Sequence, residues 1–194
     1  MENKPIKSTL TTIALDHYSK TFQLSDGSIY NCYIYDTCGQ ELFHAINESY
    51  YKKADCILLV YDITRKDTFD SLERYFIPKI KELCKENYNA ILLGNKADRQ
   101  DRKVPEKKGI ALALKYNLEF KESSCYENKN VSSAFEALVE GWNMRNKTKE
   151  REEKVIYSKT KNVKNKSSPL KEDNFKLRSK SKEIKNGKNK KKFC

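Results

Sequence analysis

Two short and continuous apolar runs constrain the fold of this chain most strongly: CILLVY at residues 56–61 and AILLG at residues 90–94. Runs of this length without polar alternation are typical of strands that are buried on both faces of a mostly parallel sheet. Residues 67–86 lie between them and repeat apolar side chains at helical spacing, which predicts a crossover helix. Strand, helix and strand in this order predict an α/β fold.

The flanking segments extend this pattern in both directions. Asp26-Gly27 separates two apolar and aromatic stretches at 22–24 and 29–35, which predicts a hairpin, since Asp-Gly favours a tight turn. A helix is expected over 105–116, with Pro105 at its start and Asn117 at its end. Residues 118–122 suit a last short strand, and 131–144 suit an amphipathic helix. We therefore expect a three-layer domain, a mostly parallel sheet with helices on both sides.

The charge is distributed very unevenly along the 194 residues. Residues 1–146 contain 21 Lys/Arg and 21 Asp/Glu, whereas 147–194 contain 18 and 6, so the tail accounts for the whole net charge of +12. Its apolar residues are too sparse to offset the entropy of ordering it. We expect one folded domain over 1–146 and a disordered basic tail over 147–194. Six cysteines without a C-x-x-C pair, and no signal peptide, indicate reduced thiols in the cytosol.

Three polar clusters follow the predicted strands directly. They are Asp36-Thr37-Cys38-Gly39-Gln40-Glu41, Asn95-Lys96-Ala97-Asp98 and Glu122-Ser123-Ser124-Cys125. Ligands of open α/β sheets bind at the carboxyl ends of the strands, so the clusters predict one shared site. D-x-x-G alone is common by chance and N-K-x-D is rarer. The three clusters in this order are much more specific than any one of them.

At these residues the sequence resembles the Rab branch of the Ras superfamily. D-T-C-G-Q-E is one substitution away from the D-T-A-G-Q-E of Rab proteins, and Leu59 to Thr64 reads L-V-Y-D-I-T as in that family. The segments at 50–54 and 12–16 resemble the Rab signatures Y-Y-R-G-A and T-I-G-V-D. The resemblance runs from about Ser8 to Trp142. It implies a P-loop-GTPase-like fold that binds GTP or GDP with Mg²⁺ and acts as a membrane-anchored switch in vesicle trafficking.

The resemblance implies a role for each residue near the phosphates. Asp36 matches the aspartate that holds Mg²⁺ through water, and Thr12 matches a second metal-sensing position. Gly39 matches the glycine whose N–H meets the γ-phosphate, and Gln40 the catalytic glutamine that orients the attacking water. Thr37 and Cys38 lie between these positions and are expected in the same site.

It also implies how the base is recognised. Asp98 matches the carboxylate that accepts hydrogen bonds from guanine N1 and N2, a donor pair that adenine lacks. Asn95 is expected to tie the loop together, and the stem of Lys96 to cover the ring with its charge solvated. Ser124 and Cys125 match the last guanine loop, where the backbone N–H of Cys125 would reach O6. Tyr126 departs from the family, which has lysine there.

The phosphate-binding motif G-x-x-x-x-G-K-[ST] does not occur in this sequence, because no two of its six glycines are five positions apart. We therefore expect the first strand, the P-loop and the first helix to be missing, with nucleotide binding weakened and hydrolysis impaired or lost. The missing strand would lie between the second hairpin strand and the strand at 56–61. Those two strands close up on each other, or the chain records part of a longer protein; a truncated gene product and an evolved pseudo-GTPase both fit.

The tail suggests partners. Lys188, Lys190, Lys191 and Lys192 precede Phe193 and Cys194, so a prenylated Cys194 beside a basic cluster would bind an anionic membrane surface. The ending is neither two cysteines nor C-a-a-X. The resemblance implies Rab effectors and escort or GDI-type proteins as partners, at the cytoplasmic face of membranes or in the cytosol when the tail is unmodified.

Two other functions remain open. The chain could be a nucleotide-free pseudo-GTPase that binds effectors or escort proteins, or a basic protein that binds nucleic acid through its tail. The zero net charge of residues 1–146 argues against a specific nucleic acid as the main partner.

Overall fold

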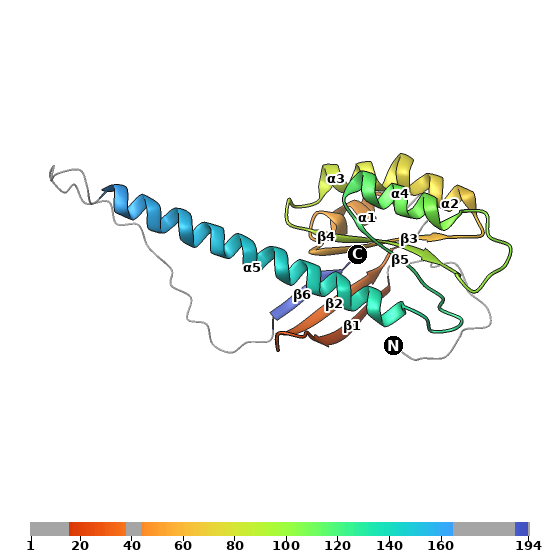
Figure 1. The fold of residues 1–194 in the computed structure, drawn as a ribbon, viewed down its shortest axis with the longest axis horizontal. Helices are drawn as coiled ribbons and strands as arrows, with labels where there is room; N and C mark the ends of the chain where they lie inside the picture. The colour runs from red at the N-terminus through yellow and green to blue at the C-terminus, as the bar shows by residue number, and fades with distance from the viewer. Residues whose placement is uncertain (1–15, 38–43, 165–188, 194) are drawn as a thin grey trace.

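The computed structural model describes residues 16–37, 44–164 and 189–193. Its sheet has six strands in the order β1-β2-β6-β3-β4-β5 (Figure 1). The pair β1–β2 is antiparallel, and all other neighbours are parallel. The strands are β1 (Asp16–Gln23), β2 (Ile29–Asp36), β3 (Cys56–Asp62), β4 (Asn89–Asn95), β5 (Glu119–Glu122) and β6 (Asn189–Phe193).

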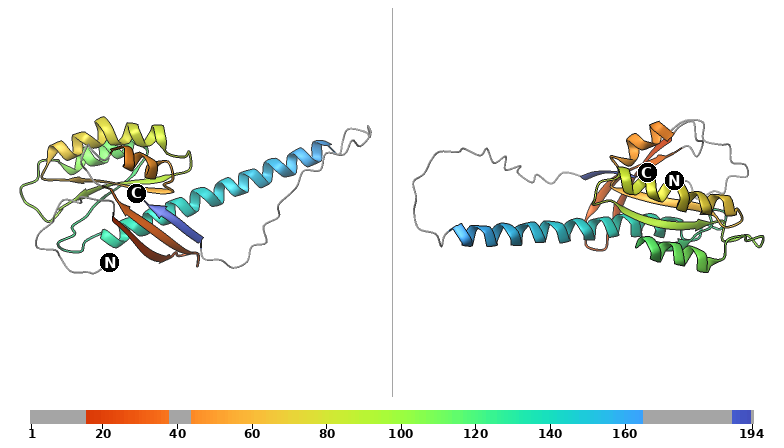
Figure 2. Two further views of the ribbon diagram at one scale, coloured as in Figure 1. Left: turned by 180° about the vertical axis from the view of Figure 1, so that it is seen from behind. Right: turned by 90° about the horizontal axis from the view of Figure 1, so that it is seen from above.

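Helices cover both faces of the sheet, which confirms the predicted α/β class (Figure 2). One core packs the helices between β3 and β5 against β3 and β4; the other packs the last helix against β2, β3 and β4. The helices are α1 (His44–Tyr51), α2 (Lys66–Ser71), the π-helical η2 (Leu72–Phe76), α3 (Ile77–Leu83), α4 (Glu106–Tyr116) and α5 (Val131–Lys164). No helix in the described ranges is both long and apolar enough to cross a bilayer.

The hairpin forms where the sequence predicts it. Gly27 adopts φ of 81°, and its N–H donates to the Leu24 carbonyl at 3.0 Å. The Asp26 carboxylate accepts the N–H of Ser28 at 2.8 Å. A glycine suits this position because a side chain rarely adopts positive φ.

The predicted helix over 67–86 is present over Lys66–Leu83, but its middle turn is π-helical. The N–H of Ile77 donates to the carbonyl of Leu72, five residues back. Pro78 explains this, because it has no N–H to offer the carbonyl four residues back and its ring crowds that turn. The predicted helix at 105–116 is also confirmed, and Asn117 ends it in the left-handed conformation.

Helix α5 differs from the prediction, since it continues to Lys164 instead of ending near Met144 (Figure 1). No glycine or proline occurs between Trp142 and Lys164, and Lys, Glu and Arg are good helix formers. Opposite charges four residues apart, such as Glu150 and Lys154, add to this propensity. The first part of the tail, expected to be disordered, is thus helical in the structure.

Strand β6 is the second difference within the tail. It occupies the position between β2 and β3 that we assigned to the missing strand, so β2 and β3 do not close up on each other. Its residues pair with Tyr30 to Ile34 of β2, and Phe193 also pairs with Cys56 of β3. Residues 165–188 and Cys194 lie outside the described part of the chain.

A chain of polar contacts ties the hairpin to α5. The buried Tyr30 hydroxyl donates to Asn143 Oδ1 at 2.7 Å, and Asn143 Nδ2 donates to Asp26 Oδ2 at 2.7 Å. Lys147 Nζ also contacts Asp26 Oδ2. Beneath these groups Trp142 packs edge-on against Tyr30, with ring centroids 5.7 Å apart. The contacts fix α5 across β2.

Replacing Asn143 by alanine should lower the free energy of unfolding by about 1–3 kcal/mol, because the buried Tyr30 hydroxyl loses its acceptor. Urea denaturation followed by circular dichroism measures this. Asn146→Ala is the matched control, since among the described residues its amide bonds to Trp142 of its own helix and to no part of the hairpin. Equal losses in both variants would contradict a role for the hairpin contact.

The second prediction concerns pH. Hydrogen bonds from Lys147, Ser28 and Asn143 hold the pKa of Asp26 well below its usual value. A carboxylate with a lowered folded pKa contributes stability above its unfolded pKa of about 4 and loses it as pH falls further. We expect Asp26→Asn to melt at a lower temperature than the parent chain at pH 6. The difference should shrink between about pH 4 and pH 2, and also in high salt, because the group is exposed. A difference that is undiminished at pH 2 would refute this role of the charge.

Candidate functional site

Two loops at the carboxyl ends of β4 and β5 are joined by backbone hydrogen bonds. The N–H of Ser123 donates to the Gly94 carbonyl at 2.8 Å, and the N–H of Ala97 donates to the Ser123 carbonyl at 2.9 Å. These bonds continue the β4–β5 ladder past the strand ends. They hold the N-K-x-D loop and the Ser-Ser-Cys loop side by side, as expected for one shared site.

Asp98 is held by a serine of the other loop. The hydroxyl of Ser124 donates to Asp98 Oδ1 at 2.5 Å and accepts the N–H of Glu127 at 3.0 Å. Ser124 is fully buried, whereas Asp98 is half-buried. Within the described ranges Asp98 Oδ2 has no protein donor, so this oxygen can accept hydrogen bonds from a ligand.

Asn95 also links the two loops. Its Oδ1 accepts from the hydroxyl of Ser123 at 3.3 Å and from Sγ of Cys125 at 3.6 Å. The expectation that Asn95 ties the loop together agrees with this geometry. Cys125 is exposed to solvent, and the next residue, Tyr126, is 75% exposed.

Lys96 has a strained backbone and a charged partner. Its φ is 66°, and its Nζ lies 2.6 Å from Asp62 Oδ2 at the end of β3. Burial raises the pKa of Asp62, but hydrogen bonds from Lys96 and Thr64 outweigh this effect and leave the pKa below its usual value. The ammonium group of Lys96 is therefore paired with Asp62, although we expected it to be solvated.

Sequence reasoning missed a second ion pair behind the loops. Arg102 donates to both oxygens of Glu122, from Nη1 at 2.6 Å and from Nη2 at 2.9 Å. Nη1 also reaches the Val104 carbonyl at 3.3 Å. A two-pronged arginine–carboxylate contact is geometrically demanding and rigid. It braces the end of β5, and nothing in the spacing of 20 residues could have indicated it.

The residues predicted near the phosphates are placed only in part. Asp36 ends β2, where it pairs with Asp16 of β1, and Thr37 follows it half-buried. Cys38, Gly39, Gln40, Thr12 and Cys194 lie outside the described residues, so their roles stay predictions. In the described part no three His, Cys, Asp or Glu side chains are grouped closely enough to hold a metal ion.

The strand register separates Asp36 from the Asn95–Asp98 loop. Ile34 and Cys56 both pair with Phe193, so Asp36 is level with Leu58, whereas Asp62 pairs with Asn95. Four residues at about 3.3 Å each place Asp36 about 13 Å below the level of Asn95. Two strands, β6 and β3, also lie between β2 and β4. The structure thus groups Asn95, Lys96, Asp98, Ser124 and Cys125 but does not bring Asp36 to them.

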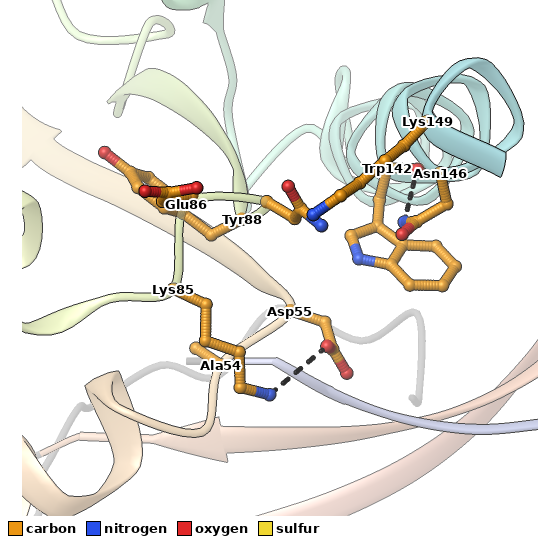
Figure 3. Close-up of a pocket in the computed structure, with 9 residues that line it drawn as sticks. Ala54, Asp55, Lys85, Glu86, Tyr88, Trp142, Asn146 and Lys149 are labelled. Atoms are coloured by element: carbon orange, nitrogen blue, oxygen red, sulfur yellow. Dashed lines mark hydrogen bonds and ion pairs between the residues drawn. The ribbon is translucent and has the colours of Figure 1, made fainter. Parts of the chain in front are cut away.

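A cavity of about 250 Å³ lies at the amino-terminal ends of β3 and β4, away from the two loops (Figure 3). Asp55 and Tyr88, which precede β3 and β4, line it together with Trp142 and Asn146 of α5. Lys85 and Asp55 are ion-paired across it at 3.9 Å. The cavity is therefore distinct from the loops at the carboxyl ends.

Comparison with known proteins identifies the family of this chain. The Ras family model matches residues 1–143. The Ras-related protein RAB1BV of Beta vulgaris is 42% identical over 134 residues, which cover 68% of this chain and 61% of that protein. Rab-8A of Bos taurus is 40% identical over 67% of this chain and 62% of its own length. Rab-26 of Mus musculus is 38% identical over 67% of this chain and 50% of its own length.

The chain therefore spans between about half and three fifths of the length of these relatives. The Ras family model matches most of the chain, and this match shows the family. The chain belongs to the Ras family, and the relatives that resemble it at about 40% identity are Rab proteins.

Proposed function

We propose that this chain binds guanine nucleotides through the two joined loops and serves as a Rab-type switch protein in vesicle trafficking. The observation that carries the proposal is the half-buried carboxylate of Asp98, held by Ser124 with its other oxygen open to a ligand. Guanine offers the adjacent N1–H and N2–H donors that such a carboxylate can accept, and adenine does not.

The neighbouring residues support recognition of a flat base. Asn95 is fixed by Ser123 and Cys125, and Lys96 is fixed by Asp62, so both reach the site without a further loss of freedom. The Arg102–Glu122 pair holds the second loop from behind. Preorganisation of this kind increases affinity because less entropy is lost on binding.

The phosphate side is a separate part of the proposal. Asp36 and Thr12 would hold Mg²⁺, Gly39 would meet the γ-phosphate and Gln40 would orient water, as the family resemblance implies. The printed sequence has no G-x-x-x-x-G-K-[ST], and Asp36 is not level with the base loops. We therefore propose base recognition with weak phosphate binding and slow or no hydrolysis for this chain.

Asp98→Asn should exchange the base preference. The asparagine side chain can donate an N–H, whereas the carboxylate can only accept. This N–H can bond to the C2 carbonyl of xanthine, but it faces another donor, the N2–H, in guanine. We expect binding of GDP to weaken at least about tenfold and binding of XDP to strengthen, because a buried mismatch leaves polar groups unpaired. Isothermal titration with each nucleotide in the presence of Mg²⁺ measures both changes.

Asp101→Asn is the matched control, since Asp101 is exposed and pairs with Arg99 outside the two loops. It should leave both affinities unchanged. If millimolar GDP and GTP produce no heat with the unmodified chain, the nucleotide-free interpretation replaces this one. The chain would then act by binding effectors or escort proteins alone.

We further propose that the tail attaches the protein to anionic membranes through lysines and a prenylated Cys194. One lipid chain binds only marginally, and each basic residue near the surface adds about 1 kcal/mol. Phe193, the preceding residue, ends β6 inside the sheet, so attachment would require β6 to leave the sheet at least at its end.

Mass spectrometry of the C-terminal peptide from cells should therefore show a prenyl group on Cys194. The protein should fractionate with membranes, and Cys194→Ser should move it to the supernatant. Cys84→Ser, which removes a half-buried thiol outside the two loops, should leave the distribution unchanged. A peptide of unmodified mass from the membrane fraction would refute this anchor.

A further inference from the structure

Asp62, Ile63 and Thr64 form a turn at the end of β3, and they belong to the L-V-Y-D-I-T segment, which lies outside the three polar clusters. The backbone N–H of Arg65 donates to the Asp62 carbonyl at 3.0 Å and closes the turn. Ile63 is fully buried in the core, and the side chain of Asp62 is only 12% exposed. The turn is therefore anchored in the fold, although it carries a carboxylate and a hydroxyl.

The main chain of this turn holds both ends of the loop at residues 95–104, which leads from β4 towards α4. The N–H of Ile63 donates to the Asn95 carbonyl at 3.1 Å. The Ile63 carbonyl accepts the N–H of Lys103 at 2.8 Å and the N–H of Val104 at 2.9 Å. A single buried residue thus ties the first residue of the 95–104 loop to its last two.

The Asp62 carboxylate adds a contact within the same loop. Its Oδ1 accepts the N–H of Thr64 at 2.8 Å and the hydroxyl of Thr64 at 2.7 Å. Its Oδ2 lies 2.6 Å from Nζ of Lys96. Thr64 therefore fixes the orientation of the carboxylate, and the second oxygen is directed at the loop. A carboxylate that is this well covered loses much of its hydration, so removal of its cation would leave it poorly compensated.

The partner of this carboxylate has an unfavourable backbone. Lys96 adopts φ of 66°, which is uncommon for a residue with a side chain and persists only where the surrounding structure holds it. The Lys96 carbonyl accepts the N–H of Arg99 at 2.9 Å, so Ala97 and Asp98 form the centre of a tight turn. The backbone angle at Lys96 therefore sets where Asp98 lies.

We propose that Asp62 is a positioning residue for the site: its ion pair with Lys96 holds the left-handed backbone there and thereby sets the position of Asp98. Asp62 acts through Lys96 and needs no contact with a ligand. The consequence for nucleotide binding rests on the function proposed above, whereas the consequence for the order of the 95–104 loop does not.

Hydrogen exchange of the full chain without nucleotide is the first measurement. Asp62→Asn keeps an oxygen for Thr64 but removes the charge that pairs with Lys96. The amides of residues 97–104 should then exchange at least about fivefold faster, because the loop opens more often, while the amides of β4 stay protected. Unchanged exchange of 97–104 would overturn the proposal.

Asp70→Asn is the matched control. Asp70 forms an ion pair of the same N–O distance, 2.6 Å, with Lys66 inside α2. Its removal should leave the exchange of 97–104 unchanged. An equal acceleration in Asp70→Asn and Asp62→Asn would overturn the proposal, because it would reflect a general loss of stability.

A double-mutant cycle tests whether Asp62 acts through Lys96. Glycine adopts positive φ readily, so Lys96→Gly removes both the partner of Asp62 and the need to hold the backbone. In the Lys96→Gly chain, Asp62→Asn should no longer accelerate the exchange of 97–104. An acceleration as large as in the parent chain would overturn the proposal, because Asp62 would then act through other contacts.

Nucleotide binding gives the last measurement. Asp62→Asn should weaken GDP and guanosine by the same factor, at least about fivefold in isothermal titration, since the loop reads the base that both ligands share. Asp70→Asn should weaken neither. A loss for GDP alone would overturn the proposal, because Asp62 would then act on the phosphates. If the unmodified chain binds neither ligand, the proposed function fails, and the exchange cycle alone decides the role of Asp62.

Discussion

The parallel ladder between β3 and β4 is the interaction on which the rest of the structure depends. Seven residue pairs, from Cys56–Asn89 to Asp62–Asn95, align two buried strands and carry their polar ends to one edge. All the residues of β4 before Asn95 are buried, so this strand is covered on both faces. Because the ladder sets where Asp62 and Asn95 emerge, it also sets the Lys96–Asp62 ion pair and the loop that holds Asp98.

The two joined loops and Asp36 depend on different parts of the sheet. The loops at Asn95–Asp98 and Ser123–Cys125 depend on β3, β4, β5 and local contacts such as Ser124–Asp98, all of which lie within residues 56–130. Asp36 depends instead on the position of β2, and in the described part of the sheet β2 is joined to β3 through the five residues of β6. The register of this short strand therefore sets how far Asp36 lies from the two joined loops.

The unusual use of the tail has a single physical origin. When an interior position of a parallel sheet is empty, the N–H and C=O groups of the two strands beside it have no partners. Almost any extended segment can pair with these groups. The sequence Asn-Lys-Lys-Lys-Phe has little preference for an interior strand. Backbone pairing with β2, in the register Cys32–Lys191, therefore accounts for its place in the sheet.

The sequence alone determined the local elements and the chemistry of the loops. Apolar runs predicted β3 and β4, Asp-Gly predicted the hairpin, Pro105 and Asn117 predicted the bounds of α4, and N-K-x-D with Ser-Ser-Cys predicted the joined loops. These features depend on neighbours in the chain, so periodicity and turn chemistry reveal them. Only the tertiary structure decided that β6 lies between β2 and β3, that Arg102 pairs with Glu122 and that Lys96 pairs with Asp62. It also decided that Asp36 is not level with the Asn95–Asp98 loop. Those outcomes depend on contacts between distant segments and on strand register, which the local pattern of a single sequence does not encode.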